Sequence, residues 1–206
     1  MRYMLCSLML LFFLKSYSQK ETVEVLEAGR LERLVLDSDE VFKISINTVP
    51  GHIIKITSRS DGEYYNDIRL ETEEVEKTLF LRSQYREILQ SGFDKLSAHK
   101  VFAMELELEI PEDFVVEVKS NVATVFLNGK YEQVLVQLKS GSCFLNNFKG
   151  DAVVNTFEGN ITVETENALI DADSRHGKVN LPHGSRGTKR ISLHSINGNI
   201  EVTETK

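Results

Sequence analysis

The residues of this chain that could support metal chemistry are its histidines, and their spacing gives little support for a metal site. None of the five shows the short spacing typical of zinc ligands. They are His52, His99, His176, His183 and His194. Asp173 and His194 fall on adjacent strands of a repeat described below and could lie about 5 Å apart. Two ligands are only half of a metal site, and a solvent-facing polar column explains the pattern as well. That column contains Gln137, Asn155, Asp173 and His194. We favour the column and predict no metal and no cofactor.

Candidate catalytic residues are equally sparse. The carboxylates of the repeat are Glu164, Glu166, Asp171 and Asp173, whereas glycan-cleaving β-helices need clustered acids or cations along a groove. Four to five strands would stack to roughly 20–24 Å, which is short for gripping a sugar chain. Cys143 falls in an apolar, inward-facing series of positions, where a thiol behaves as a small hydrophobe and its pKa rises. We therefore predict no catalytic residue and no enzyme.

A basic cluster surrounds the loop at residues 182–190 and gives the candidate binding residues. Its members are Arg175, Lys178, Arg186, Lys189 and Arg190. A run of charge is usually a solvated turn. The functional interpretation is contact with an anionic glycan or a lipid headgroup. The sequence contains no phosphate-cradling loop and no nucleophile motif.

The elements that carry these residues follow from a repeat of eighteen residues. Steps of eighteen from Gly159 reach Gly141 and Ala123 in one direction and Gly177 in the other, and a step of 21 then reaches Gly198. The second and fourth residues after each anchor are apolar in every copy, against 41% apolar residues in the chain. These residues are Val125, Cys143, Ile161, Val179 and Ile200, and then Leu127, Leu145, Val163, Leu181 and Val202.

A second alternating stretch follows in each copy, so every repeat contains two short strands joined by turns. Its apolar positions are Val134, Ala152, Ile170 and Ile191, and then Val136, Val154, Ala172 and Leu193. One such unit cannot bury its apolar face alone, but stacked units form a continuous core. We predict an all-β fold containing a small β-solenoid, or parallel β-helix, over 119–206. The glycines would mark close corners between successive coils. An antiparallel meander is the alternative.

The segment 19–118 is predicted to be a β-rich cap over the first coil of the solenoid. Strands are expected at 41–46, 53–57, 67–72, 78–82, 101–110 and 114–119, with a short helix or long loop at 83–98. Phe126, Leu135, Phe144 and Val153 face outward on early coils, and we expect them to form one apolar patch. We favour the segment 20–118 as the cover of this patch. One continuous domain over 19–206 is expected.

Residues 1–18 have the layout of a secretory signal peptide, with Arg2, an apolar run from Leu5 to Leu14, and small residues before Gln19. The apolar run is too short to span a bilayer as a helix. Cleavage would lower the net charge from −7 to −9, because it removes two cations and no acid. An acidic chain argues against nucleic-acid binding. Only Cys143 would remain, so no internal disulfide is expected.

Several stretches make the chain resemble the bacterial "putative adhesin" head-domain family of exported proteins of unknown function. The resemblance lies in ELEIPEDFVVEVKSN (107–121), DKLSAHKVFAMELEL (94–108), GNITV (159–163) and SINGNIEVT (195–203). It implies a right-handed parallel β-helix and export to the periplasm, the outer surface or the medium. It brings no catalytic residues.

These observations together predict an exported, non-catalytic, adhesin-like protein of the cell envelope that acts by binding or scaffolding. The partner would be an envelope protein or a glycan, and no membrane-spanning segment is expected in the mature chain. Two alternatives stay open: a carbohydrate-active β-helix enzyme, and an envelope sensor or scaffold that binds another protein.

Overall fold

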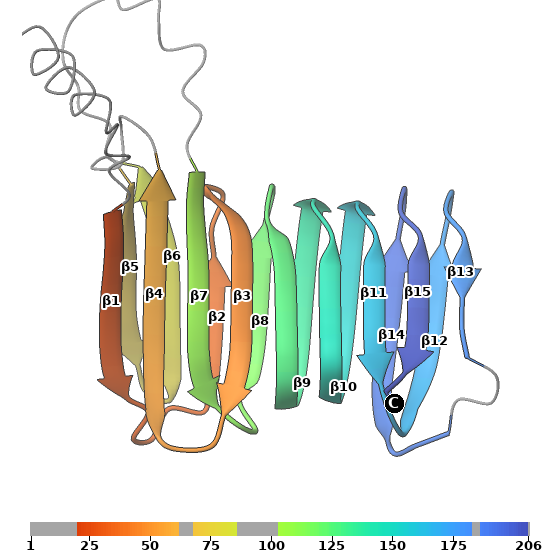
Figure 1. Cartoon of the computed structure of the whole chain (residues 1–206), viewed down its shortest axis with the longest axis horizontal. Coiled ribbons are helices and arrows are strands. Elements are labelled where there is room, and N and C mark those ends of the chain that lie inside the picture. The colour runs from red at the N-terminus through yellow and green to blue at the C-terminus, as the bar shows by residue number, and fades with distance from the viewer. Residues whose placement is uncertain (1–19, 62–67, 86–102, 183–185, 206) are drawn as a thin grey trace, which may run out of the picture.

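The computed structural model describes residues 20–61, 68–85, 103–182 and 186–205 (Figure 1). The described residues form fifteen strands of one mixed sheet that is not closed into a barrel, and they include no helix. The strands are β1 (Lys20–Glu27), β2 (Arg33–Asp37), β3 (Val41–Val49), β4 (Ile53–Asp61), β5 (Ile68–Val75), β6 (Thr78–Tyr85), β7 (Ala103–Pro111), β8 (Val115–Ser120), β9 (Thr124–Ser140), β10 (Cys143–Glu158), β11 (Ile161–Thr165), β12 (Ala168–Ser174), β13 (Val179–Asn180), β14 (Lys189–Ser195) and β15 (Ile200–Glu204). The signal-peptide prediction at 1–18 and most of the helix-or-loop prediction at 83–98 lie outside the described residues.

The sheet bends back on itself into two layers of strands, called here the first face and the second face, and the core lies between them (Figure 1). The first face has the strand order β1-β4-β7-β3-β9-β10-β11-β15-β13. The second face has the order β5-β6-β2-β8-β9-β10-β14-β12. β9 and β10 belong to both faces because each bends midway, and the register between them shifts near Asn146 and Lys149.

The repeat pairs in register, as the sequence predicts. Val125 lies beside Cys143, and Cys143 lies beside Ile161, in parallel strands of the first face. On the second face Val134 pairs with Ala152, which pairs with Ile191. These side chains are all buried, so the alternating apolar positions form the core. The antiparallel meander is therefore wrong for the repeat.

The spatial order of the last two repeats differs from their order in the sequence. Ile161 pairs with Ile200, and Val179 lies beyond Ile200 at the edge of the sheet. On the second face, β14 likewise lies between β10 and β12. The chain therefore runs outward through β12 and β13 and returns to insert β14 and β15. As a result Val179 is 40% exposed, whereas Ile200 is 1% exposed.

A ladder of side-chain oxygens explains this order. The backbone N–H of Asn160 donates to Ser142 Oγ, that of Asn199 donates to Asn160 Oδ1, and that of Lys178 donates to Asn199 Oδ1. At the two inner positions Asn160 and Asn199, the side-chain oxygen accepts the backbone N–H of the next strand. A lysine ammonium has no acceptor. Lys178 can therefore only end the ladder, which places β13 at the outer edge.

The corner glycines pack as closely as the repeat predicts. A Cβ on Gly141 would lie 2.1 Å from the carbonyl oxygen of Ala123, and one on Gly159 would lie 1.9 Å from that of Gly141. Gly159 also has a positive φ of 145°. Glycine is required here by both steric space and backbone conformation.

The N-terminal segment forms the six strands predicted for it, and it contains two that were missed, β1 and β2. Its strands join the same two faces. β3 pairs in parallel with β9, placing Ile44 beside Val125, and β2 pairs with β8, placing Leu34 beside Val116. The apolar columns of the repeat thus continue through the N-terminal segment.

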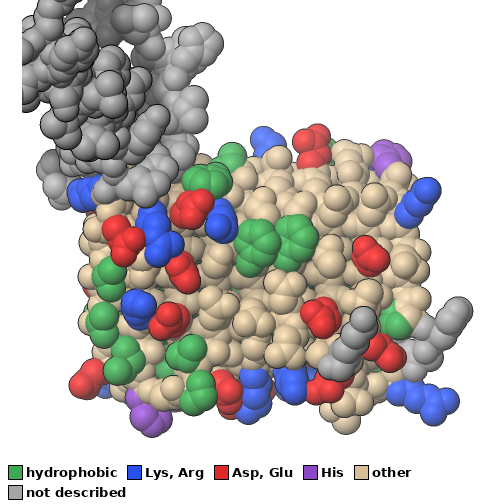
Figure 2. Space-filling model, in the orientation of Figure 1, with side chains coloured by type: hydrophobic (Ala, Val, Ile, Leu, Met, Phe, Trp, Pro, Cys, Tyr) green, Lys and Arg blue, Asp and Glu red, His purple; other side chains and the backbone are tan. Residues whose placement is uncertain are grey.

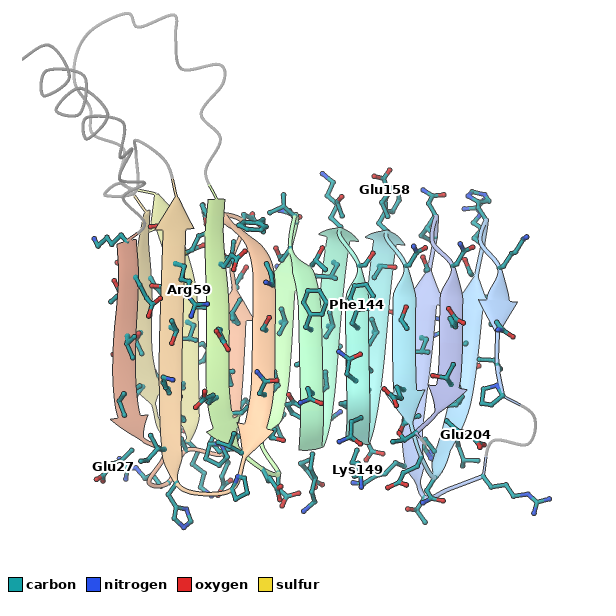
Figure 3. The ribbon with its side chains drawn as sticks, viewed as in Figure 1. Glu27, Arg59, Phe144, Lys149, Glu158 and Glu204 are labelled. Carbon is teal, nitrogen blue, oxygen red and sulfur yellow. The ribbon has the colours of Figure 1, made fainter. Side chains whose placement is uncertain are left out.

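The predicted cover over the outward apolar residues is wrong for the described residues. The N-terminal strands extend the faces edge to edge, with Ser45 beside Phe126, and do not lie over them (Figure 1). The single patch is wrong as well. Phe126 and Phe144 stack at 4.8 Å on the first face, where Figure 3 labels Phe144. Leu135 and Val153 pair on the second face. Alternation along bent strands separates the two pairs.

Candidate binding groove

The predicted basic cluster is divided between two ends of one strand. Arg175 and Lys178 follow the last residue of β12. Lys189 and Arg190 instead pair with the first two residues of β12, Ala168 and Leu169. The seven residues of β12 separate these ends by about 20 Å. The five cations therefore form no single site.

Lys189 and Arg190, beside the start of β12, also have local contacts. Lys189 Nζ lies 4.0 Å from Asp151, and the backbone N–H of Arg190 donates to the same carboxylate. Arg186 is exposed near Pro182. Arg175 lies at the other end of β12 and lines a separate groove described below.

The predicted chemical candidates occupy non-catalytic positions. Asp173 and His194 pair in register, yet His194 Nε2 hydrogen-bonds with Ser192 Oγ at 3.0 Å. No group of three or more possible metal ligands occurs among the residues that the structure describes. Cys143 is buried, and its burial raises the pKa of the thiol to about 12. Its inward, apolar position is as predicted.

The carboxylates of the repeat are not brought together. Glu164 lies on the first face and Asp171 on the second. Glu166 pairs with Lys149 at 2.7 Å, at the lower corner that Figure 3 labels. A glycosidase needs two carboxyl groups flanking one bond. Of the four, only Asp171 and Asp173 lie on the same outer side of one strand, and only Asp173 lines the groove described below.

A groove of about 940 Å³ runs across five strands at the opposite corner. It follows the end of the second face, beside the corner where Figure 3 labels Glu158. Three consecutive residues from each of the five levels line it. They are Lys119–Asn121, Gln137–Lys139, Asn155–Phe157, His194–Ile196 and Asp173–Arg175, in spatial order.

The stacking of these tripeptides gives the groove two walls and a floor. The first residues form one wall, which is the polar column predicted from the sequence, extended by Lys119. The third residues form the other wall, in the order Asn121, Lys139, Phe157, Ile196 and Arg175. The middle residues form the floor. Most of these are Ser or Thr, and Ser120, Thr156 and Ser195 are buried.

The floor is fixed by hydroxyl hydrogen bonds to the corners. Thr156 Oγ1 donates to the carbonyl of Gly159 and lies 3.0 Å from Ser195 Oγ. Ser174 Oγ donates to the carbonyl of Gly198. Thr156 and Ser195 are buried. These bonds hold the corner backbone, so the walls are positioned by a rigid framework.

The walls carry polar groups without partners. Within the described structure, the side chains of Gln137 and Asn155 make no hydrogen bond to another residue, and Phe157 is 51% exposed. Lys119, Lys139 and Arg175 are exposed and form no ion pair, although Asp37 neighbours Lys119 on the next strand. Asp173 is the one acidic residue among the described lining residues. An apolar surface with a few convergent polar groups is typical of ligand sites.

No family model matches the chain, and no curated protein matches it in sequence. Its fold is similar to that of solved structures. One is a "putative cell adhesion protein" from Clostridium sporogenes, with a TM-score of 0.64 and 18% identity, covering 91% of this chain and 100% of that one. Another is a "putative adhesin" from Bacteroides fragilis, with a TM-score of 0.40 and 13% identity, covering 90% and 98%. The first shows a shared fold, and its name agrees with the family that the sequence resembles. The described residues contain no apolar helix long enough to cross a bilayer.

Proposed function

We propose that this chain is an exported, non-catalytic, adhesin-like protein of the cell envelope, and that its groove binds a glycan chain. The groove crosses five strands spaced about 4.8 Å apart, so it offers roughly 19 Å along its axis. That length suits an extended ligand lying across the strands. The stack of strands was judged short for an enzyme that cleaves a sugar chain. The same length is sufficient for binding a few sugar units.

The observation that carries this proposal is the combination of free amides with an exposed aromatic ring. The amides of Gln137 and Asn155 each offer donors and an acceptor. Sugar hydroxyls need both. Phe157 supplies an apolar surface on the facing wall, against which the C–H face of a sugar ring can pack. An aromatic surface with oriented polar groups beside it binds such a ligand without any chemistry.

The finer features of the fold and its location are part of the same proposal. In-register parallel pairing from Val125 to Ile200 supports a parallel β-helix over 119–206, and the family resemblance implies that it is right-handed. The pairing of β3 with β9 supports one continuous domain from residue 19 onward. The signal-peptide layout of residues 1–18 supports export.

A second candidate function is binding of another protein. It is favoured by the half-buried, stacked rings of Phe126 and Phe144 on the first face, away from the groove. Aromatic residues are enriched where proteins associate. The enzyme alternative rests on Asp171 and Asp173 alone, because Glu164 lies on the other face and Glu166 pairs with Lys149.

A glycan array probed with the purified chain tests the proposal. We expect binding to a subset of linear glycans and a loss of about tenfold or more in affinity for Phe157→Ala. Phe42→Ala is the matched control, because Phe42 is 41% exposed on β3, away from the groove. Equal affinities for the wild type and Phe157→Ala would contradict binding in the groove. A wild type that binds no glycan would leave the protein-binding function as the better candidate.

A further inference from the structure

We infer that the glycan bound in the groove is anionic, with acidic groups that face the two ends of the groove. This inference rests on the proposed function and adds the charge of the ligand to it. It is carried by three cations of the walls, Lys119, Lys139 and Arg175.

Two of the cations lie at the ends of the groove, and the third lies one level from its centre. Lys119 belongs to the first level and Lys139 to the second, whereas Arg175 belongs to the fifth. The centre is formed by the amide of Asn155 and the ring of Phe157. Four strand spacings of about 4.8 Å place the outer cations roughly 19 Å apart. A linear chain could therefore lie with a sugar ring at Phe157 and acidic groups toward both ends.

The charge of these cations is not satisfied by the protein. Several cations outside the groove pair with carboxylates on neighbouring strands or turns. Examples are Arg33, Lys43, Lys55, Arg59, Lys77 and Arg82. Lys119, Lys139 and Arg175 make no such pair with any described residue. A ligand carboxylate or sulfate could supply the missing partner, and arginine can bind such a group through two parallel hydrogen bonds.

The charge of the groove differs in sign from the net charge of the chain. The net charge is −7, so an anionic polymer is repelled by much of the surface. Among the described residues that line the groove, three are permanent cations and one is acidic, Asp173. The groove therefore carries a local excess of positive charge on an acidic chain. That arrangement would favour one docking position for a charged chain.

Two matched pairs of oligosaccharides test the inference. One pair is hexagalacturonate and its methyl ester, and the other is a sulfated hexasaccharide without uronic acids and its desulfated, neutral form. We expect the charged member of at least one pair to bind tenfold or more tightly than its neutral counterpart. The pair that responds distinguishes carboxylate from sulfate. The advantage should shrink as the salt concentration rises from about 0.1 M to about 1 M, because the Debye length falls from ~10 Å to ~3 Å.

Charge-removing variants assign the effect to the groove. The triple variant Lys119→Gln, Lys139→Gln, Arg175→Gln should bind the preferred charged oligosaccharide at least tenfold more weakly. The control triple variant Lys43→Gln, Lys55→Gln, Lys77→Gln removes the same charge from ion pairs outside the groove and should keep its affinity. Equal weakening in both variants would reduce the effect to net charge and overturn the inference.

The failure of the inference can be told apart from that of the proposed function. If charged and neutral members bind equally, or if only neutral glycans bind in the array, glycan binding stands and the anionic preference is wrong. If no glycan binds the wild type, both are wrong.

Discussion

The N-terminal strands and the groove share one core and differ in what their outer side chains do. Over the N-terminal strands, cations and carboxylates lie next to each other across strands (Figure 2). Arg59 there contacts both Glu21 and Glu107, and these hydrogen bonds raise the pKa of its guanidinium. In the groove, the amides of Gln137 and Asn155 and the charge of Arg175 have no such partners.

Charged groups of the N-terminal strands are therefore paired within the described structure, whereas those of the groove are not. Exposed ion pairs contribute only about 0–1 kcal/mol each to folding. They do, however, leave few polar groups available to a ligand. The groups in the groove remain hydrated until another molecule replaces the water. We therefore place binding in the groove and not on the N-terminal strands.

The largest expected effect comes from breaking the core that both regions share. Ile161→Asp puts an unpaired charge into a fully buried column and should cost several kcal/mol or abolish folding. Thr162→Asp, one residue further, faces outward and should be nearly neutral. Chemical denaturation of both variants measures the difference. Similar losses from the two substitutions would show that the register is wrong.

Gly159→Ala tests the close corner beside the groove against an open turn. The new Cβ would meet the carbonyl of Gly141 at 1.9 Å, in addition to an unfavourable φ, so we expect a loss of several kcal/mol. Gly51→Ala has a similarly positive φ but no atom within 4 Å of the new Cβ. It should cost only the backbone strain, about 1–3 kcal/mol. Thermal unfolding of the two variants compares them. A Gly159→Ala variant as stable as Gly51→Ala would argue against direct stacking of the corners.

The buried thiol of Cys143 predicts a pH dependence of the shared core. Burial raises its pKa from 9.0 to about 12, so the native state holds the thiol protonated at a pH where the unfolded state ionises. Its contribution to stability is full below pH 9 and is lost between pH 9 and 12. Cys143→Val, which matches its neighbour Val125, should lack this loss. The stability difference between the two proteins should change by about 1 kcal/mol from pH 9 to 10. Urea denaturation at several pH values measures both stabilities. A stability difference that stays constant from pH 9 to 10 would contradict this prediction.

The smallest expected effects on stability come from removing one cation of each region, Arg59 of the N-terminal strands or Arg175 of the groove. Arg59→Gln removes contacts to two carboxylates and should lower stability slightly while leaving glycan affinity unchanged. Arg175→Gln removes no described contact of the side chain, so its stability should change by less than about 0.5 kcal/mol. Its affinity for the preferred anionic glycan should fall. Denaturation and binding titrations on both variants measure these quantities, and the opposite assignment of effects would undo the comparison.

The inward pattern of the strands was predictable because it depends on alternation alone. Every step of eighteen residues from Val125 to Ile161 returns an apolar side chain, and these residues pair as expected. The inserted order of β14 and β15 was not predictable from those positions, since Ile200 and Val179 are equally suited to a core. The discriminating signal lay beside the glycines, where Asn199 can accept a hydrogen bond and Lys178 cannot.

The groove was predictable only in part. The column containing Gln137 and Asn155 is visible in the sequence, and it forms one wall. The second wall lies two residues further along each strand, at Lys139 and Phe157, where the chain turns at the corner. Alternation assigns both columns to the outside and does not say that the surface between them is hollow. The basic cluster was misjudged for a similar reason, because residues close in sequence lie at opposite ends of β12.

The most direct test of binding in the groove is a map of backbone amide chemical shifts on addition of the preferred oligosaccharide. The account predicts changes at the five stacked tripeptides, with Asn155–Phe157 at the centre and Lys119 and Arg175 at the ends. The amides around Lys43, Lys55 and Arg59 should stay unchanged. Changes centred on those ion-paired strands, or on Phe126 and Phe144, would contradict it.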